Sequence, residues 1–407
     1  MRGSTADRSL VRGINRSVVL RTVKEAGALS RADLARASGL SQVTIGSIVS
    51  ELIDRQLLVE GDEAPSNGGR PSRLLLLNGG AYVAAGLKVT EDHVVGALTD
   101  LEATVLAEAT RPLATAEPEN AAAAVGELIG DLLTESGVTA SRLLGVGIGM
   151  AGVIDGPSGV CRYSPFLGWR DVAVADLVGA VVGVPVLVDN DVNTLALAER
   201  WFGVGQGVSD FLLVTVGRGV GLGIVTDGSL FRGAAGAAGE FGHTLVDDSD
   251  RPCSCGRTGC LEAIVGEAAL LEATRDVRRR RRRSQPRTPA ELYKLIEKDA
   301  DVAALVAAAG RTLGRGVANL VNLFAPELVI VSGEGLEAGP TLVDAIADEV
   351  GRHVFPGLAG SYRLVAEPLP EGAWARGAAS LVLGELFETP TRTQLDLLAR
   401  VHGGSQA

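Results

Sequence analysis

Residues 214–262 read VTVGRGVGLGIVTDGSLFRGAAGAAGEFGHTLVDDSDRPCSCGRTGCLE, and this stretch is the most informative about the fold class. It opens with two apolar runs punctuated by glycine, as in strands joined by a tight turn. It ends with one histidine and three cysteines. Further apolar runs with glycine occur on both sides of it, and they alternate with segments of helical spacing. Such alternation of strands and helices is typical of an α/β protein.

The strands of this pattern fall into two groups, which predicts two lobes that enclose a cleft. A helix at 192–202 separates the groups, and a late helix at 372–387 is expected to return to the first group. The first lobe is predicted to span 79–190 and 372–388, and the second 191–371. The strands are expected at 82–89, 94–100, 143–152 and 184–191 in the first lobe, and at 211–217, 222–228 and 327–333 in the second.

Three of the four cysteines crowd into eight positions, close to a histidine. His243, Cys253, Cys255 and Cys260 offer one imidazole and three thiols, the donor set of a closed tetrahedral zinc site. A closed site leaves no position for a catalytic water, so we expect a structural Zn²⁺ that staples a loop with little core of its own. Reduced thiols beside an unrelated histidine, or a redox sensor, are the alternatives. The fourth cysteine, Cys161, is expected to be buried.

The amino-terminal segment has the pattern of a helix-turn-helix domain. Helices are predicted at 14–26, at 31–39 with Ser30 as its cap, and at 42–56 with Ser41 as its cap. In this arrangement the capped last helix enters the major groove of DNA with its N-terminal residues. The polar side chains expected to face DNA there are Ser41, Gln42, Thr44 and Ser47.

Two short strands follow, at 57–61 and 72–78, and they flank a loop with the sequence DEAPSNGGRP. This loop is expected to form a wing that carries Arg70 towards the minor groove. Residues 1–78 are therefore predicted to be a winged helix-turn-helix DNA-binding domain. The alternative is a small three-helix domain that serves dimerisation.

Charge is unevenly distributed along the chain. The net charge is −11, yet residues 1–77 hold 11 Lys and Arg against 8 Asp and Glu. A polyphosphate would be repelled by the acidic remainder, so double-stranded DNA is expected to bind at the basic amino-terminal end. The sequence has no apolar stretch of the roughly 18 residues that a membrane span needs, which predicts a cytoplasmic protein without a membrane partner.

The quoted stretch resembles the signature of the repressor, ORF and kinase (ROK) family. The segment VPVLVDNDVNTLALAE, at 184–199, resembles the family's active-site segment, and the winged helix with its GGRP wing resembles the regulator branch. The similarity covers residues 10–385. It implies a two-lobed actin-like, sugar-kinase-like fold of the ribonuclease H-like type, and a role in regulating sugar-utilisation genes.

The resemblance also implies a sugar site. In the kinases of the family the aspartate that corresponds to Asp191 deprotonates the sugar hydroxyl, and the residue that corresponds to Asn190 binds a neighbouring hydroxyl. Alternatively, these two residues form an Asx turn, Glu240 and Glu262 lie at solvated helix ends, and Gly152 and Ser164 are turn residues. The full expected set is Asn190, Asp191, Glu240, His243, Glu262, Gly152 and Ser164.

The chain departs from the kinase pattern where phosphate should bind. Family kinases have a strand that ends in an aspartate and a Gly-Gly-Thr turn, whereas this chain reads AAGLKVTEDHVV and has Lys88 instead of the aspartate. The second phosphate-contacting turn carries Arg218, and Glu334 replaces a glycine that is usual near the nucleotide. Because backbone amides of such turns cradle the phosphates, phosphoryl transfer is expected to be lost.

These observations predict a sugar-responsive repressor that a monosaccharide effector releases from its operator. A homodimer, or a dimer of dimers, would place two recognition helices about one helical turn of DNA apart. A working sugar kinase, or a docking partner of a transport or signalling protein, are the alternatives. The arginine run at 278–283 is expected to be a solvated loop, with an extra phosphate contact as the alternative, and no role is assigned to the tail at 389–407.

Overall fold

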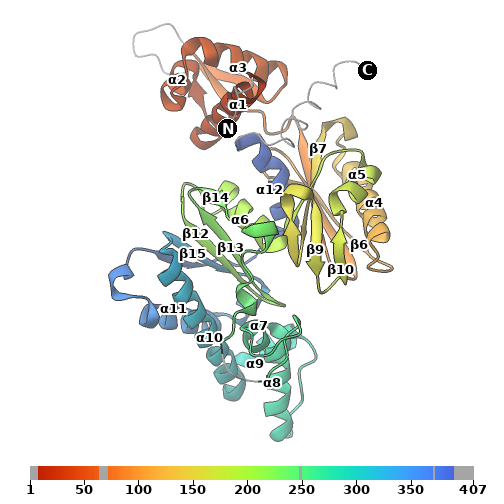
Figure 1. Cartoon of the computed structure of the whole chain (residues 1–407), viewed down its shortest axis with the longest axis vertical. Coiled ribbons are helices and arrows are strands. Elements are labelled where there is room, and N and C mark those ends of the chain that lie inside the picture. Colours follow the sequence, from red (N-terminus) through yellow and green to blue (C-terminus); the bar gives the residue numbers. More distant parts are fainter. Residues whose placement is uncertain (1–7, 64–71, 247–249, 370–371, 389–407) are drawn as a thin grey trace, which may run out of the picture.

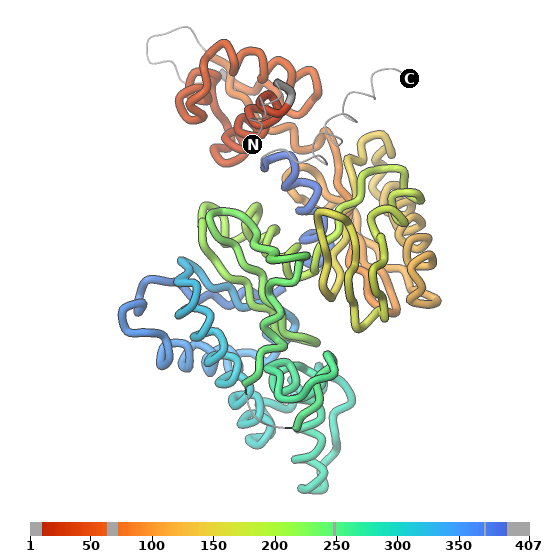
Figure 2. The backbone as a smooth tube through the Cα atoms, in the orientation of Figure 1, coloured from red at the N-terminus to blue at the C-terminus, as the bar shows by residue number. Residues whose placement is uncertain are grey.

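The structure, a computed structural model, describes residues 8–63, 72–246, 250–369 and 372–388. Along the chain an amino-terminal helical unit is followed by two lobes, each of which contains a five-stranded sheet. Figures 1 and 2 show the amino-terminal unit at one end of the molecule and α8–α10 of the second lobe at the other. The mixed α/β architecture predicted from the sequence is confirmed.

The amino-terminal unit consists of three helices and a small antiparallel sheet in the order β1-β3-β2. Two serines begin the second and third helices as predicted, because Ser30 Oγ accepts a hydrogen bond from Asp33 N at 3.2 Å and Ser41 Oγ one from Thr44 N at 3.1 Å. The first helix begins six residues earlier than expected. The elements are α1 (Arg8–Ala26), β1 (Leu29–Ser30), α2 (Arg31–Ser38), α3 (Gln42–Asp54), β2 (Leu58–Glu63) and β3 (Arg73–Leu77).

The first lobe has a mixed sheet in the order β11-β7-β4-β5-β6, with α4 and α5 packed against one face. A second, smaller sheet has the order β10-β9-β8 and includes Cys161, which is buried as expected. The elements are β4 (Val83–Val89), β5 (His93–Thr99), β6 (Val105–Pro112), α4 (Pro118–Ser136), β7 (Leu143–Met150), β8 (Val153–Asp155), β9 (Val160–Ser164), β10 (Trp169–Val172), α5 (Val174–Val182) and β11 (Val186–Asn190).

The second lobe has a sheet in the order β14-β13-β12-β15-β16, covered on one face by α10 and α11. Its elements are β12 (Phe211–Val216), β13 (Val220–Thr226), β14 (Ser229–Leu230), α7 (Glu262–Val265), α8 (Glu267–Arg280), α9 (Pro289–Ile296), α10 (Ala300–Phe324), β15 (Leu328–Ser332), α11 (Pro340–His353) and β16 (Arg363–Ala366).

Two helices, α6 (Asp191–Phe202) and α12 (Ala373–Phe387), pack against each other between the two large sheets. The second sheet buries its other face against α6. The first sheet accepts α12 so closely that a Cβ atom on Gly86 or Gly147 would lie within about 2 Å of a carbonyl oxygen of that helix. Glycine at these two positions therefore permits α12 to return to the first sheet, as the sequence pattern predicts.

The amino-terminal unit shares a hydrophobic core with the two central helices. Val19, Leu20 and Val23 of α1 belong to the same buried cluster as Trp201 of α6 and Phe387 of α12. The removal of apolar surface from water is the main favourable contribution when one element packs on another. The amino-terminal unit is thus packed directly onto the ends of α6 and α12.

The expectation of a solvated arginine loop at 278–283 is wrong for the first half of the run. Residues 278–280 form the last turn of α8, and the side chain of Arg278 is buried in an ion pair with Asp299. Arg283 also contacts Asp299, at 3.0 Å. Within the described residues, no helix has the length and apolar character needed to cross a membrane.

Candidate functional site

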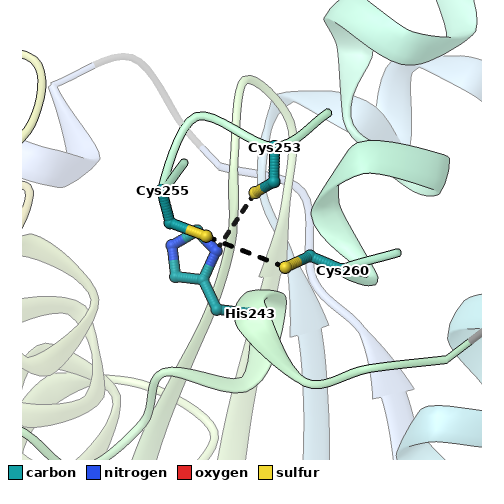
Figure 3. Close-up of side chains that lie close together, drawn as sticks. All are labelled: His243, Cys253, Cys255 and Cys260. Atoms are coloured by element: carbon teal, nitrogen blue, oxygen red, sulfur yellow. Dashed lines mark hydrogen bonds between the residues drawn. The ribbon is translucent and has the colours of Figure 1, made fainter. Parts of the chain in front are cut away.

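The predicted metal ligands come together in the segment that precedes α7 (Figure 3). The ligand atoms of His243, Cys253, Cys255 and Cys260 all lie within 4.8 Å of one another. His243 ends a short 3-10 helix, and the three cysteines lie on the loop that leads into α7. Backbone bridges from Leu245 to Cys260 and from Pro252 to Thr258 close this loop.

Two of the separations within the cluster match the edges of a tetrahedral metal site. A tetrahedron with Zn–S bonds of about 2.3 Å has edges of about 3.8 Å. The Sγ atoms of Cys255 and Cys260 are 3.8 Å apart, and Cys253 Sγ is 3.4 Å from His243 Nδ1. Although burial opposes it, hydrogen bonds from Arg257 and from the neighbouring thiols lower the pKa of Cys255 to about 7. A thiolate, the form that binds metals, is therefore accessible near neutral pH.

Four of the predicted sugar contacts meet where β11 runs into α6. The side-chain oxygen of Asn190 caps α6 by accepting from Val192 N at 2.9 Å, and its Nδ2 donates to Gly152 O at 3.1 Å. Gly152 approaches β9 so closely that a Cβ there would lie 2.9 Å from Ser164 Cα. Ser164 Oγ is buried and has no hydrogen-bond partner among the described residues. Asp191, the first residue of α6, completes this group.

The remaining sugar candidates lie at the metal cluster. His243 directs Nδ1 to the thiols and Nε2 to Glu240, whose carboxylate is 3.8 Å away. Glu262 accepts hydrogen bonds from Val220 N at 3.2 Å and from Ser254 Oγ at 2.8 Å. Within the described part of the chain, no hydrogen bond or ion pair joins these two carboxylates directly to the group at the start of α6.

A buried polar network beneath Asn190 was not predicted from the sequence. Asp189, which is 1% exposed, accepts from Asn193 Nδ2 at 2.9 Å and from Arg232 Nε at 2.6 Å. Since Asp189 belongs to β11 and Arg232 follows β14, this ion pair connects the two lobes. The Asp-Asn-Asp run at 189–191 was the signal that could have revealed it, because a third polar residue at a strand end rarely lacks a partner.

The first departure from the kinase pattern makes contacts with the starts of both central helices. Lys88 Nζ is 3.1 Å from Asp191 Oδ2, and it lies over the ring of Trp374 at 3.4 Å from the centroid. The ammonium therefore pairs with a carboxylate oxygen of a predicted sugar-binding residue, and the indole acts as its cation–π partner.

The other two departures also form contacts between the lobes. Arg218 makes a bidentate ion pair with Glu91 of the first lobe, at 2.6 and 3.0 Å, which holds the pKa of Glu91 below its ordinary value. Glu334 accepts a hydrogen bond from Trp374 Nε1 at 2.8 Å. Protein side chains thus pair with one another at the three positions where the kinase pattern would provide for phosphate, metal or nucleotide.

The candidate DNA-binding face is the start of α3. Ser41, Gln42 and Ser47 are exposed, whereas Thr44 is half-buried and shares a hydrogen bond with Ser41. The opposite side of α3 is buried through Ile45, Ile48, Val49 and Leu52. Val43 was not predicted from the sequence; it is 84% exposed on the same face and is the type of residue that contacts a thymine methyl group. Arg70 lies outside the described residues.

Comparison with known proteins identifies similar chains over nearly the whole length. The model of the ROK family matches residues 84–385. The xylose repressor of Bacillus subtilis is 29% identical over 95% of this chain and 99% of its own. The DNA-binding transcriptional dual regulator NagC of Escherichia coli is 29% identical over 92% of this chain and 93% of its own.

Solved structures give the same picture of the fold. A ROK family transcriptional regulator, described as a homologue of the E. coli MLC protein, has a TM-score of 0.84 at 24% identity and covers 97% of this chain and 100% of its own. A ROK family glucokinase from Streptomyces griseus, in complex with glucose and AMPPNP, has a TM-score of 0.65 at 27% identity. It covers 74% of this chain and 98% of its own.

Proposed function

Because the chain belongs to the ROK family, we propose that it is a sugar-responsive, DNA-binding transcription regulator, and specifically a repressor of carbohydrate-utilisation genes that a monosaccharide releases. The observation that carries this proposal is the capped helix α3, whose first turns present exposed polar side chains at the amino-terminal end. The named repressors align with this end of the chain as well as with the lobes, whereas the glucokinase covers 74% of the chain.

Operator recognition would depend on the N-terminal turns of α3. Gln42 and Ser47 would contact base edges in the major groove, and Arg70 would contact the minor groove. A single domain of this size reads a short half-site, so a homodimer would place two α3 helices about 34 Å apart on a palindromic operator. The protein would act in the cytoplasm, where the operator is.

The effector would bind at the start of α6. A neutral sugar is held by groups that accept and donate several hydrogen bonds at once, and Asn190 and Asp191 are such groups. The unpaired hydroxyl of Ser164 supports the same location, because a buried polar group without a partner costs about 1–3 kcal/mol until one is supplied. Glu240, His243 and Glu262 would complete the pocket when the lobes close around the sugar.

We further propose that the chain does not transfer phosphate, although the family includes kinases. With Lys88 3.1 Å away, Asp191 already has an ammonium partner and would act as a hydroxyl acceptor rather than as a base. Arg218 and Glu334 are engaged with Glu91 and Trp374, so neither is available to a nucleotide. A retained sugar kinase activity is the second candidate, since Asn190 and Asp191 are both present.

Zn²⁺ would be held by His243 and the three cysteines as a structural ion. When bound, it would supply cross-links for a loop that has little hydrophobic core. It would also fix the ring of His243, whose other nitrogen faces Glu240, so that the metal orients part of the sugar pocket.

Gel retardation on the DNA upstream of the protein's own gene tests DNA binding directly. The wild-type protein should form a discrete complex that competitor DNA of unrelated sequence does not remove. The double variant Gln42→Ala/Ser47→Ala should weaken this complex by about tenfold or more, since each base contact is worth about 1–3 kcal/mol. The control Thr134→Ala, on the exposed surface of α4, should bind as the wild type does. An undiminished complex for the double variant would contradict the proposed use of α3.

A further inference from the structure

The amino-terminal unit holds the ends of both central helices through one lysine. Lys24, in the last turn of α1, donates from Nζ to the backbone oxygen of Trp201 at 2.6 Å. The same ammonium lies 4.5 Å from the ring centroid of Phe202 and 5.5 Å from that of Phe387. A cation at the carboxyl end of a helix is stabilised by the unpaired carbonyls there, and aromatic rings add a cation–π contribution.

The helix that Lys24 contacts begins at the candidate sugar site. α6 starts with Asp191, is capped by Asn190, and ends at Phe202, where Lys24 contacts it. At 1.5 Å per residue its 12 residues span about 18 Å. Nine of its side chains are buried, so the helix is packed along its length and should move as a rigid body. A displacement at Asn190 and Asp191 would therefore reach Lys24.

The second central helix repeats this arrangement. At its start, Trp374 of α12 contacts Lys88 of β4 and Glu334 of the second lobe. At its end, Phe387 of α12 contacts the ammonium of Lys24. Both central helices therefore end at the same lysine of the amino-terminal unit.

On the other side, α1 is fastened to the recognition helix. Arg12 Nε and Arg16 Nη1 donate to the carboxylate of Glu51 on α3, at 2.7 and 2.8 Å. Both arginines precede Lys24 on α1, so a tilt of this helix would carry α3 with it. The packed helix α6 thus connects the candidate sugar site to Lys24, and ion pairs connect α1 to the candidate DNA-binding helix α3.

We propose that Lys24 is the positioning residue that couples effector binding in the cleft to the placement of α3 on DNA. The ammonium contacts the ends of both α6 and α12, so a change in the positions of these ends would move Lys24 and, with it, α1. This inference rests on the proposed function, because it concerns how the same sugar site is read by the same recognition helix. Lys24 itself touches neither sugar nor DNA.

The ratio of operator dissociation constants with and without sugar tests this coupling. Fluorescence anisotropy on a labelled operator fragment gives the ratio for the wild type, Lys24→Met, Lys24→Arg and the surface control Lys294→Met, with xylose, N-acetylglucosamine and glucose as sugars. Calorimetry without DNA gives sugar affinity. A coupled wild type should show a ratio of about 5 to 150. Lys24→Met should retain both separate affinities within about threefold while its ratio falls below about 2, and Lys24→Arg should restore most of the ratio.

The contrary outcomes are distinct. A purely structural lysine would weaken operator binding equally with and without sugar, and an unchanged ratio for Lys24→Met would overturn the inference. If Lys24→Met does not fold, the same ratio of operator dissociation constants is measured for Lys24→Gln and Phe387→Leu. Each of these variants removes part of the contact between Lys24 and the ends of the central helices, so an unchanged ratio would again overturn the inference. If the wild type responds to none of the sugars, the proposed function fails in its effector, and the coupling inference fails with it.

Discussion

Replacing Glu51 by glutamine should destabilise the amino-terminal unit strongly. The carboxylate of Glu51 is paired with Arg12, Arg16 and Arg55 at 2.6 to 2.8 Å, and its side chain is 13% exposed. The side chains of Arg16 and Arg55 are each 9% exposed, so the substitution leaves two buried guanidinium groups without their counter-charge. Loss of one partner of a buried pair costs about 3–5 kcal/mol. Because Arg12 is half exposed and contributes little, we expect the free energy of unfolding to fall by about 3 kcal/mol, at the lower end of this range.

Urea unfolding followed by circular dichroism measures this loss, and its pH dependence identifies the cause. Burial alone would raise the pKa of Glu51, but hydrogen bonds from Arg12 and the charges of Arg55 and Arg16 hold it below the ordinary 4.5. A lowered carboxyl pKa adds stability above the unfolded value, and this stability disappears as the pH falls through the folded value. The free energy of unfolding of the wild type should therefore exceed that of Glu51→Gln by a constant amount from pH 7 to about 5. Below about pH 4.5 this difference should become progressively smaller.

The exposed pair of Glu127 with Arg111 provides the control. Glu127 is 63% exposed in a contact of 2.7 Å, so Glu127→Gln should cost less than about 1 kcal/mol. A loss of unfolding free energy below about 1 kcal/mol for Glu51→Gln would contradict a stabilising role for the buried ion pairs of Glu51. A difference from the wild type that persists undiminished at about pH 3 would contradict it as well.

Three further predictions concern packing, metal and effector. Gly147→Ala places a Cβ 1.8 Å from the carbonyl oxygen of Ala378, so thermal unfolding should show that the free energy of unfolding falls by about 1–3 kcal/mol or more. The control Gly130→Ala, which has open space around the new Cβ, should be neutral or stabilising. Elemental analysis should find about one zinc per chain, and Cys255→Ser or a chelator should lower the melting temperature; a full melting temperature in metal-free protein would contradict a structural ion. Asp191→Asn should weaken sugar binding about tenfold or more in calorimetry, with operator affinity in the absence of sugar unchanged; equal sugar affinity would move the effector site elsewhere.

Local signals in the sequence predicted most of the regular structure. The caps Ser30 and Ser41 and the closing Gly39, with φ of 69°, follow from side-chain chemistry within a few residues, and the structure has them where expected. The apolar strands of both large sheets were predicted for the same reason. The first turns of α1 were not predicted, because residues 8–13 have no apolar stripe of their own and acquire their helical state from the packing that follows.

Short or amphipathic strands were missed. β6 alternates exposed and partly buried residues at the edge of its sheet, and β8 has only three residues, so neither produces an apolar run. The arginine run was misjudged because the partner of Arg278 is Asp299, which lies 21 residues further along the chain. A run of like charges indicates solvation unless a distant counter-charge is known, and sequence alone does not supply one.

The candidate site shows the same division between local and distant information. The types and order of its residues were legible in the motifs, including the cluster of His243 with three cysteines, whose ligand atoms the structure brings within 4.8 Å. What the sequence left out was the partner of each unusual residue. Lys88 was recognised as a replacement, but its contacts with Asp191 and Trp374 depend on elements more than a hundred residues away.

We propose that a kinase-like body recognises a sugar without phosphorylating it and uses that recognition to control DNA binding. The most direct measurement combines operator retardation with ATP consumption in the same reaction, with and without xylose, N-acetylglucosamine or glucose. The protein should form a specific complex that one of the sugars dissociates, with no ATP consumed beyond the protein-free rate. Sugar-dependent ATP consumption without retardation would contradict it and would make the protein a kinase.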